Sequence, residues 1–111
     1  MQEYLFSYGT LQNEKTQLDI FGHLLPGTPD ILEGYKLFTI EINDNKFLAR
    51  GENKFQSTLV CTNYSGDQVA GTVFEIDKTE LAFTDRYEPG NYQRIKVTLR
   101  SGKEAWIYLS V

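Results

Sequence analysis

The sequence predicts a small α+β domain in which about six strands form a mixed, mainly antiparallel β-barrel accompanied by two short helices. Several short runs are rich in β-branched and aromatic residues and end at turn-forming residues. Two other segments combine a capping residue with apolar residues at helical spacing. Closing such a sheet into a barrel removes its exposed strand edges. The 111 residues fit one domain, 1–111, with one hydrophobic core.

The composition excludes several classes of protein. Hydrophobic residues at 41% and charged residues at 23% are typical of a folded chain. A net charge of −4 disfavours nucleic acid as a partner. One cysteine and one histidine cannot form an internal disulfide or the usual metal cluster. No apolar run is long enough to span a bilayer, so we expect a cytoplasmic protein without metal or membrane attachment.

The first elements are a strand over Tyr4–Tyr8, which ends at Gly9-Thr10, and a helix capped by Asn13. Pro26-Gly27 is expected to stop this helix. Its apolar stripe consists of Leu18, Phe21, Leu24 and Leu25.

Strands are expected to dominate the middle of the chain. Residues 31–42 are rich in β-branched and aromatic side chains, and 43–46 supply turn residues. Residues 57–61 and 69–76 are predicted to form a hairpin joined through 64–67. Residues 49–56 show no period and are predicted to form a loop, a kind of segment that often lines sites.

A second helix is predicted to begin near Lys78, because Asp77 and Glu80 have the spacing of a capping box. It should end by Pro89-Gly90. The alternation of residues 94–100, followed by Ser101-Gly102 and residues 103–109, predicts a terminal hairpin.

Two carboxylates on the second helix are the main candidates for chemistry. Leu81, Asp85 and Glu88 stand at positions i, i+4 and i+7, and therefore share one stripe. Partial burial, the negative charge of Asp85 and the negative end of the helix dipole would all raise the pKa of Glu88. A glutamate with a raised pKa can accept and return a proton near neutral pH.

Other interpretations of these carboxylates remain open. Glu88 could be a solvated residue at a helix end. Asp85 could bond a nearby backbone N–H or pair with Arg86 or Arg94, a supporting role that we favour. A glycosidase pair is disfavoured, because residues three apart on one helix cannot easily flank a sugar bond.

The end of the first strand offers a second candidate feature. Tyr8-Gly9-Thr10-Leu11 presents successive backbone N–H groups at a turn, which can bind a carboxylate or a developing oxyanion. An ordinary turn has the same pattern.

Other chemically capable residues receive structural interpretations. Cys61 lies in an apolar run and is predicted to be a core cysteine. His23 is expected to act as a cap or to favour the dipole of the first helix. Trp106 and Tyr108 alternate with Ala105 and Ile107, as in a strand with two packed faces.

The order of these motifs resembles that of the γ-glutamylcyclotransferase-like family, and its avirulence-induced-protein-like and small bacterial branch in particular. The resemblance lies in residues 4–11, in Asp85-Arg86-Tyr87-Glu88 and in Tyr92-Gln93-Arg94. Shorter matches run along the whole chain: Phe21-Gly22, Leu32-Glu33-Gly34-Tyr35, Gly71-Thr72-Val73-Phe74, Ser101-Gly102 and Ala105-Trp106-Ile107-Tyr108.

The resemblance implies an enzyme that needs no cofactor and releases 5-oxoproline from a γ-glutamyl amine or peptide. In that scheme the α-amine attacks its own γ-carbonyl, and Glu88 transfers the proton to the leaving nitrogen. Gly9, Thr10 and Leu11 would hold the glutamyl group through backbone N–H groups. Tyr8 and Tyr92 would form the cavity wall. Arg94 would contact the substrate or orient a carboxylate, unless it is a surface charge.

The expected partner is therefore a small γ-glutamyl molecule, and the expected state is a monomer or a weak homodimer. Gln12 stands where many relatives carry a basic residue, and Thr84 stands where an apolar residue is common. These departures bear on which γ-glutamyl substrate fits. The alternative is a non-catalytic small-molecule-binding or interaction module on the same fold, because a fold alone does not fix function.

Overall fold

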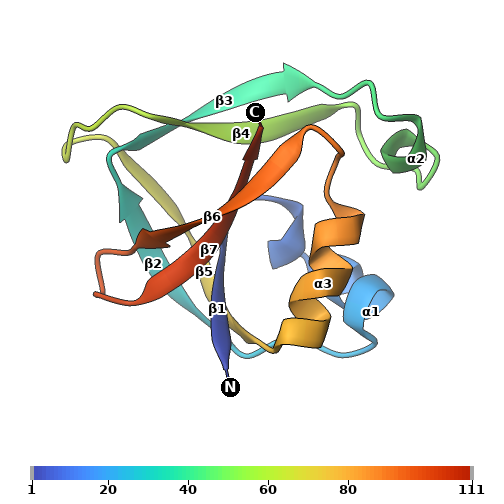
Figure 1. The fold of residues 1–111 in the computed structure, drawn as a ribbon, viewed down its shortest axis with the longest axis horizontal. Helices are drawn as coiled ribbons and strands as arrows, with labels where there is room; N and C mark the ends of the chain where they lie inside the picture. The colour runs from blue at the N-terminus through green and yellow to red at the C-terminus, as the bar shows by residue number, and fades with distance from the viewer. Residues whose placement is uncertain (1, 111) are drawn as a thin grey trace.

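The computed structural model describes residues 2–110, which form a mixed α+β fold (Figure 1). No helix in this range is long and apolar enough to cross a bilayer. Its elements, in chain order, are β1 (Glu3–Ser7), the 3₁₀-helix η1 (Thr10–Gln12), α1 (Glu14–Phe21), β2 (Gly27–Glu33), β3 (Tyr35–Glu41), α2 (Asn45–Leu48), β4 (Phe55–Cys61), β5 (Gln68–Ile76), α3 (Lys78–Tyr87), β6 (Tyr92–Thr98) and β7 (Glu104–Ser110).

The strands form two sheets. The larger has the order β2-β5-β1-β7-β6, with β1 at its centre. β1 is antiparallel to β5 and parallel to β7, where Leu5 lies opposite Trp106. The remaining pairs in both sheets are antiparallel, so the prediction of a mixed, mainly antiparallel arrangement is confirmed. β3 and β4 form the second sheet, which lies across one end of the first (Figure 1).

A corner at Gly34 divides the strand that was predicted over 31–42. Gly34 has a φ of 83°, which side chains disfavour, and its amide donates to the Asp67 carbonyl at 2.8 Å. Its carbonyl accepts a hydrogen bond from the Thr62 amide at 2.8 Å. Both chain segments pass from one sheet to the other at this corner, so β4 pairs with β3 and β5 pairs with β2. The predicted hairpin between 57–61 and 69–76 is therefore wrong.

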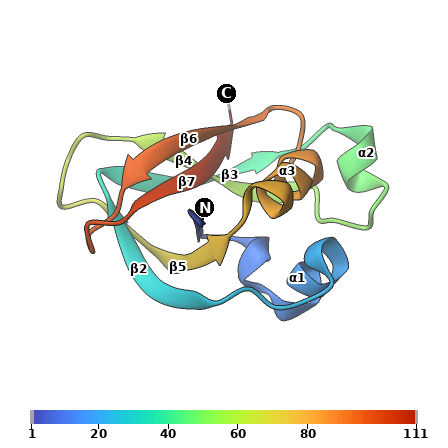
Figure 2. The ribbon, with the colours of Figure 1, turned by 60° about the horizontal axis from the view of Figure 1, so that its bottom comes forward.

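The closed barrel is not confirmed. Where β4 approaches β7, the contact runs through a side chain: the Ser110 amide donates to Thr58 Oγ1 at 2.8 Å. No backbone ladder joins these two strands within residues 2–110, and the described strands number seven rather than about six. Figure 2 shows the larger sheet curved around the interior, with β2 and β5 on one side and β6 and β7 on the other.

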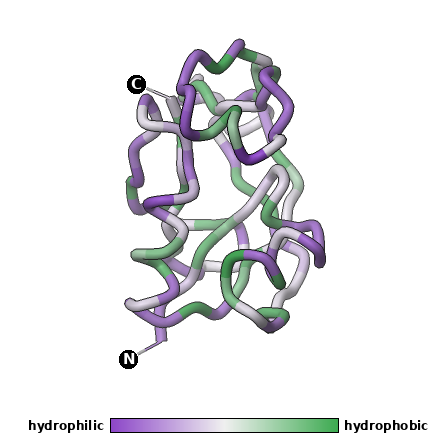
Figure 3. The backbone as a smooth tube through the Cα atoms, turned by 90° about the vertical axis from the view of Figure 1, so that its right-hand side faces the viewer, coloured by the Kyte–Doolittle hydropathy of each residue, from purple (hydrophilic) through white to green (hydrophobic). Residues whose placement is uncertain are grey.

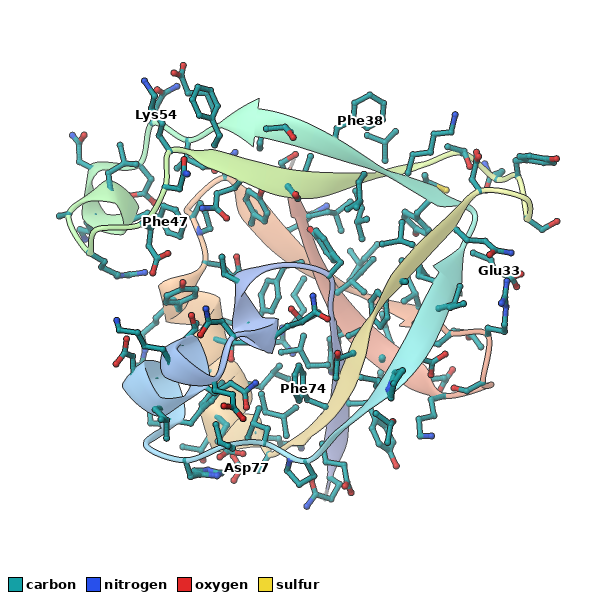
Figure 4. The ribbon with its side chains drawn as sticks, turned by 180° about the vertical axis from the view of Figure 1, so that it is seen from behind. Glu33, Phe38, Phe47, Lys54, Phe74 and Asp77 are labelled. Atoms are coloured by element: carbon teal, nitrogen blue, oxygen red, sulfur yellow. The ribbon has the colours of Figure 1, made fainter. Side chains whose placement is uncertain are left out.

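The fold has two adjoining hydrophobic clusters. Phe6 and Ile107 belong to the cluster between the two sheets. Leu5, Phe74 and Leu81 belong to the cluster between the larger sheet and the helices. Figure 4 shows Phe74 in this interior and Phe38 on the outer face of β3, where Phe38 is 51% exposed. Hydrophobic and hydrophilic stretches accordingly alternate along the backbone (Figure 3).

The secondary-structure predictions for residues 77–110 are confirmed. The capping box of α3 forms as expected: Asp77 Oδ1 accepts from the Glu80 amide at 2.7 Å, and Glu80 Oε1 accepts from the Asp77 amide at 3.1 Å. Asp77 is labelled at the start of this helix in Figure 4. β6 and β7 form the terminal hairpin.

The first helix is shorter than predicted. α1 ends at Phe21, because Gly22 adopts a left-handed conformation with a φ of 76°. Leu25 is buried and Phe21 packs against the core, but Leu18 and Leu24 are 51% and 46% exposed, so the predicted apolar stripe is wrong for these two residues. The most buried residue of α1 is instead Gln17.

Two further predictions for the middle of the chain are corrected. Asp44 caps the short helix α2 within the predicted turn 43–46, and β4 begins at Phe55, inside the predicted loop 49–56. Cys61 is exposed rather than a core residue, because it ends β4 next to the Gly34 corner.

His23 connects the end of α1 to the start of α3, as Nε2 lies 2.5 Å from Glu80 Oε2. Its other ring nitrogen lies 3.0 Å from the Leu24 carbonyl oxygen. The hydrogen bond with Glu80 is the main cause that raises the pKa of His23.

We predict that this contact stabilises the fold more at acidic than at alkaline pH. A raised pKa means that the folded state favours the protonated ring, so the stabilisation is complete below the unfolded pKa of about 6.5 and is lost as pH rises through the folded pKa. Urea unfolding of wild type and His23→Ala between pH 5.5 and 9 should show a difference that shrinks with pH. Lys15→Ala, which removes the exposed Lys15–Asp19 pair, is the control and should show no such trend. If His23→Ala changed the free energy of unfolding equally at every pH, the result would contradict a pH-dependent contact between His23 and Glu80.

Candidate active site

A cavity of about 570 Å³ opens between the β1–α1 connection, the segment after α2 and the C-terminal end of α3. This volume is in the range of small-molecule sites. Five of the predicted site residues lie in its wall: Tyr8, Gly9, Thr10, Leu11 and Tyr92. Glu88 lies there as well.

The connection after β1 supplies backbone donors to this wall. β1 ends at Ser7, and the chain then forms the single 3₁₀ turn η1. The amides of Thr10 and Leu11 donate to no acceptor within residues 2–110, while the Gly9 amide lies 3.4 Å from Ser7 Oγ. A Cβ atom built on Gly9 would meet no protein atom within 4 Å. Free N–H groups beside open space can bind an anion.

Buried Gln17 fixes the position of this connection. Its Nε2 donates to the Leu11 carbonyl at 3.0 Å, and its Oε1 accepts from the Leu25 amide at 2.9 Å. Both ends of the side chain are therefore satisfied inside the protein. Gly71 permits a second close approach, since a Cβ there would lie 2.3 Å from the Ser7 carbonyl oxygen.

Glu88 is the residue that follows the last turn of α3. Its amide still donates to the Thr84 carbonyl at 3.0 Å, but its φ of −65° and ψ of 152° turn the chain out of the helix. The side chain is partly buried, and its carboxylate has no hydrogen bond or ion pair within residues 2–110. Thr84, which stands where an apolar residue is common in the family that the sequence resembles, is fully buried and donates its hydroxyl to the Glu80 carbonyl at 3.0 Å.

Burial raises the pKa of Glu88 to about 8. The negative charges of Asp85 and Glu52 act in the same direction, and the positive charge of Arg50 opposes them. Burial and Asp85 are the causes expected from the sequence. Near pH 8 this carboxyl group populates both its protonated and its ionised form.

Asp85 and Arg94 lie beside the cavity rather than in its wall. Arg94 Nε is 3.0 Å from Asp85 Oδ1, and Arg94 Nη2 donates to Asp85 Oδ2 at 3.1 Å. Tyr108 donates its hydroxyl to Asp85 Oδ1 at 2.6 Å, and the Arg94 guanidinium lies 4.3 Å from the Trp106 ring centre. The structure thus pairs Arg94 with Asp85, in agreement with the interpretation that Arg94 orients a carboxylate. It does not bring Arg94 into the cavity wall, where the alternative of a substrate contact would place it.

Tyrosines hold the remaining wall together. Tyr92 donates its hydroxyl to the Ser57 carbonyl at 2.8 Å, and Tyr8 donates to the Tyr108 carbonyl. Burial raises the pKa of Tyr92 to about 12 and that of Tyr8 still higher. These hydroxyl groups therefore remain protonated donors at working pH.

Sequence reasoning missed the wall contributed by residues 47–57. Phe47 is buried and lines the cavity, together with Asn53, Phe55 and Gln56. The predicted loop at 49–56 was the available signal, and the aromatic residues near its ends could have strengthened it. Within residues 2–110 no group of His, Cys, Asp and Glu side chains has the arrangement of a metal site.

We predict that Gln17→Met destabilises the protein by about 2 kcal/mol, because it leaves a buried carbonyl and a buried amide without partners at similar side-chain volume. Urea unfolding measures the change. Gln93→Met, at an exposed position of β6, is the matched control and should change stability by less than about 0.5 kcal/mol. Equal stability of Gln17→Met and wild type would show that Gln17 does not hold the connection.

Solved structures share this fold at low sequence identity. A solution structure from Arabidopsis thaliana has a TM-score of 0.76 and 19% identity, and covers 100% of this chain and 63% of its own. A structure described as a gamma-glutamyl cyclotransferase has a TM-score of 0.68 and 20% identity, with 100% and 68% coverage. An uncharacterized protein of Homo sapiens has a TM-score of 0.71 and 23% identity, with 99% and 67% coverage. This chain thus spans about two thirds of the length of each.

A search of curated proteins finds no significant match. The model of the family described as "Gamma-glutamyl cyclotransferase, AIG2-like" matches residues 5–110, a range that includes the connection after β1 and Glu88. The resemblance seen in the sequence is therefore confirmed, and the chain belongs to the gamma-glutamyl cyclotransferase, AIG2-like family.

Proposed function

We propose that this protein is a cyclotransferase that releases 5-oxoproline from a γ-glutamyl amine or peptide, with Glu88 as the acid/base group. One observation carries the proposal: the Glu88 carboxyl group, with a pKa near 8 and no partner within residues 2–110, faces the same cavity as the amides of Thr10 and Leu11, which donate to no acceptor in that range. Proton transfer and oxyanion stabilisation are the two tasks of this reaction.

The reaction is an intramolecular aminolysis. The α-amine of the γ-glutamyl group attacks its own γ-carbonyl carbon, which forms the C–N bond of the five-membered ring. Ionised Glu88 takes a proton from the attacking nitrogen as the tetrahedral intermediate forms. The same proton then passes to the leaving nitrogen as the original γ-amide bond breaks. No water or cofactor is consumed.

Backbone groups would bind the non-reacting part of the substrate and the developing charge. Fixed amides at Gly9, Thr10 and Leu11 lose no side-chain entropy when they bind an anion. Tyr8 and Tyr92 line the same cavity, and their hydroxyl groups already donate to backbone carbonyls, so they act as walls. Asp85 and Arg94 act indirectly: Arg94 holds the Asp85 carboxylate in place, and the negative charge of this carboxylate acts on Glu88.

We predict that Glu88→Gln lowers 5-oxoproline release by at least about a thousandfold, because the amide cannot take the proton. The assay is release from a panel of γ-glutamyl amines and dipeptides. In wild type, kcat/KM should rise with pH through about 8 as Glu88 ionises. Wild-type turnover by Glu88→Gln would exclude the mechanism. Ligand-induced thermal stabilisation without turnover of any substrate would favour the binding-module alternative.

The same variant should show that loss of activity is not loss of fold. Because the pKa of Glu88 rises from 4.5 to about 8 on folding, the folded protein binds more protons than the unfolded chain between these pH values. Wild-type stability therefore falls as pH rises through this window, by at most about 1.4 kcal/mol for each increase of one in pH. Glu88→Gln should lose this dependence and be the more stable protein at pH 8 in urea unfolding. A lower stability at pH 8 would contradict the burial of this carboxyl group.

We also predict a preference for leaving amines that carry no carboxylate. Glu88 is the only acidic residue in the described wall of the cavity, and no Lys, Arg or His lies there to balance a second negative charge. γ-Glutamyl-ethylamide should therefore exceed γ-glutamyl-glycine in kcat/KM by about tenfold, the effect of one repulsion of about 1.4 kcal/mol. Added salt should reduce the difference in kcat/KM between the two substrates, because it screens the repulsion. Faster turnover of γ-glutamyl-glycine than of γ-glutamyl-ethylamide would contradict the predicted preference for leaving amines without a carboxylate.

A further inference from the structure

The segment from Asp44 to Glu52 holds the end of α3 on both sides of Glu88. Arg50 donates Nη2 to the Arg86 carbonyl at 2.9 Å and Nη1 to the Tyr87 carbonyl. On the other side, Asp44 Oδ2 accepts from the Gly90 amide at 2.7 Å. Glu88 thus lies between two backbone anchors that come from a different part of the chain.

The two oxygens of Asp44 have separate roles. Oδ1 caps α2 by accepting from the amides of Lys46 at 3.0 Å and Phe47 at 3.3 Å. Oδ2 is left for Gly90. One side chain therefore fixes both the start of α2 and the chain after Glu88.

Tyr87 strengthens the same contact. Its hydroxyl donates to Glu52 Oε1 at 2.8 Å, and the Arg50 guanidinium lies 5.4 Å from its ring centre. Its ring also meets Phe47 edge-on, with the centres 6.1 Å apart. Residues 44–52 and 86–90 are thus joined by polar and by aromatic contacts.

Glu88 needs such anchors because it is outside the regular helix. The last carbonyls of a helix lack intrahelical partners, and the backbone turns away at Glu88. The Glu88 carboxylate has no hydrogen bond of its own within residues 2–110. Its direction into the cavity therefore depends on where its backbone is held.

We propose that Asp44 and Arg50 are positioning residues that hold the backbone on either side of Glu88 and so aim its carboxyl group into the cavity. The proposal rests on the proposed function for its kinetic consequences. Its physical consequences can be measured without turnover.

Arg50 also acts on Glu88 through its charge. It is the cation that lowers the pKa of Glu88 against the opposing effects of burial and of two carboxylates. The groups that face Glu88 from the surrounding elements are Asp85 and Tyr87 on α3, Glu52 and Arg50 after α2, Tyr8 after β1, Tyr92 on β6 and Tyr108 on β7. Removal of Arg50 leaves only negative or neutral groups in this set.

Arg50→Gln should lower kcat for 5-oxoproline release about tenfold or more, with KM within about twofold, since a misplaced group costs mainly the chemical step. The midpoint of the pH profile should move upward by about 0.5 pH or more, because a nearby positive charge is gone. Arg50→Lys keeps the charge but cannot bridge two carbonyls, so its midpoint should stay near that of wild type while kcat falls. Arg100→Gln, which breaks an exposed ion pair with Glu33, is the control and should change neither kcat nor the midpoint of the pH profile.

Asp44→Asn separates the two roles of Asp44 at constant shape. The asparagine can still cap α2 through its oxygen, but its amide group offers an N–H to the Gly90 N–H, and this contact is lost. We expect kcat to fall severalfold and hydrogen exchange at the Gly90 amide to accelerate at least about tenfold, while exchange in the strands is unchanged. If the Gly90 amide exchanged at the wild-type rate in Asp44→Asn, the role of Asp44 in holding the chain after Glu88 would be excluded.

The decisive measurement is independent of turnover. The Glu88 carboxyl carbon can be followed by ¹³C NMR during a pH titration, with Glu88→Gln identifying its signal. A higher midpoint in Arg50→Gln than in wild type, with Arg50→Lys unchanged, supports the effect of the Arg50 charge on Glu88, whether or not any γ-glutamyl compound is a substrate, and equal midpoints in Arg50→Gln and wild type overturn that effect. Hydrogen exchange at the Gly90 amide in Asp44→Asn tests the backbone anchor, also without turnover. If wild type releases no 5-oxoproline but this exchange accelerates and the midpoint shifts, the proposed function fails and the positioning of Glu88 stands.

Discussion

The central strand β1 is the element on which the rest of the structure depends. It is bonded to both β5 and β7, so it joins the two halves of the larger sheet. Its neighbouring residues also divide between the two cores: Leu5 packs against the helices and Phe6 lies between the sheets, and each is 1% exposed. Because adjacent residues of a strand point to opposite faces, one short strand fixes both layers. The connection with the free amides then starts from a rigid position.

This rigidity explains how the residues of the cavity wall can be held in position although they lie outside helices and strands. The wall of the cavity consists of chain segments that leave regular elements: the turn after β1, the residue after α3 and the segment after α2. Gln17 anchors the first of these, while Asp44 and Arg50 anchor the second to the third. Unpaired backbone N–H groups and an unpaired carboxyl group are costly in a protein interior, so they need such support from outside the cavity.

Local sequence patterns predicted the local features of the fold. The capping box at Asp77 and Glu80 and the turn at Ser101-Gly102 depend on residues close in the chain, and both are where the sequence placed them. The cavity wall at Tyr8–Leu11 was implied by the family resemblance. The raised pKa of Glu88 comes partly from its neighbour Asp85, but its main cause is burial, which depends on the whole fold. The prediction of strand pairing was wrong for β4. Whether β4 pairs with β5 or with β3 is decided at the Gly34 corner, by contacts between residues distant in sequence. Gln17 and Arg50 were missed for the same reason: a polar residue gives no local sign that it will bond a distant carbonyl.

The parallel pairing of β1 with β7 has a consequence for how the chain acquires its structure. The strand at the centre of the larger sheet is synthesised before its neighbour β7, so Leu5 can pair with β7 only after Trp106 has been made. During synthesis β1 can pair with β5 but keeps one edge open until β7 has left the ribosome, and an open central edge is prone to association with other chains. Contacts of such long sequence separation also slow folding. The arrangement that gives the finished protein a rigid centre thus makes the nascent chain dependent on β7.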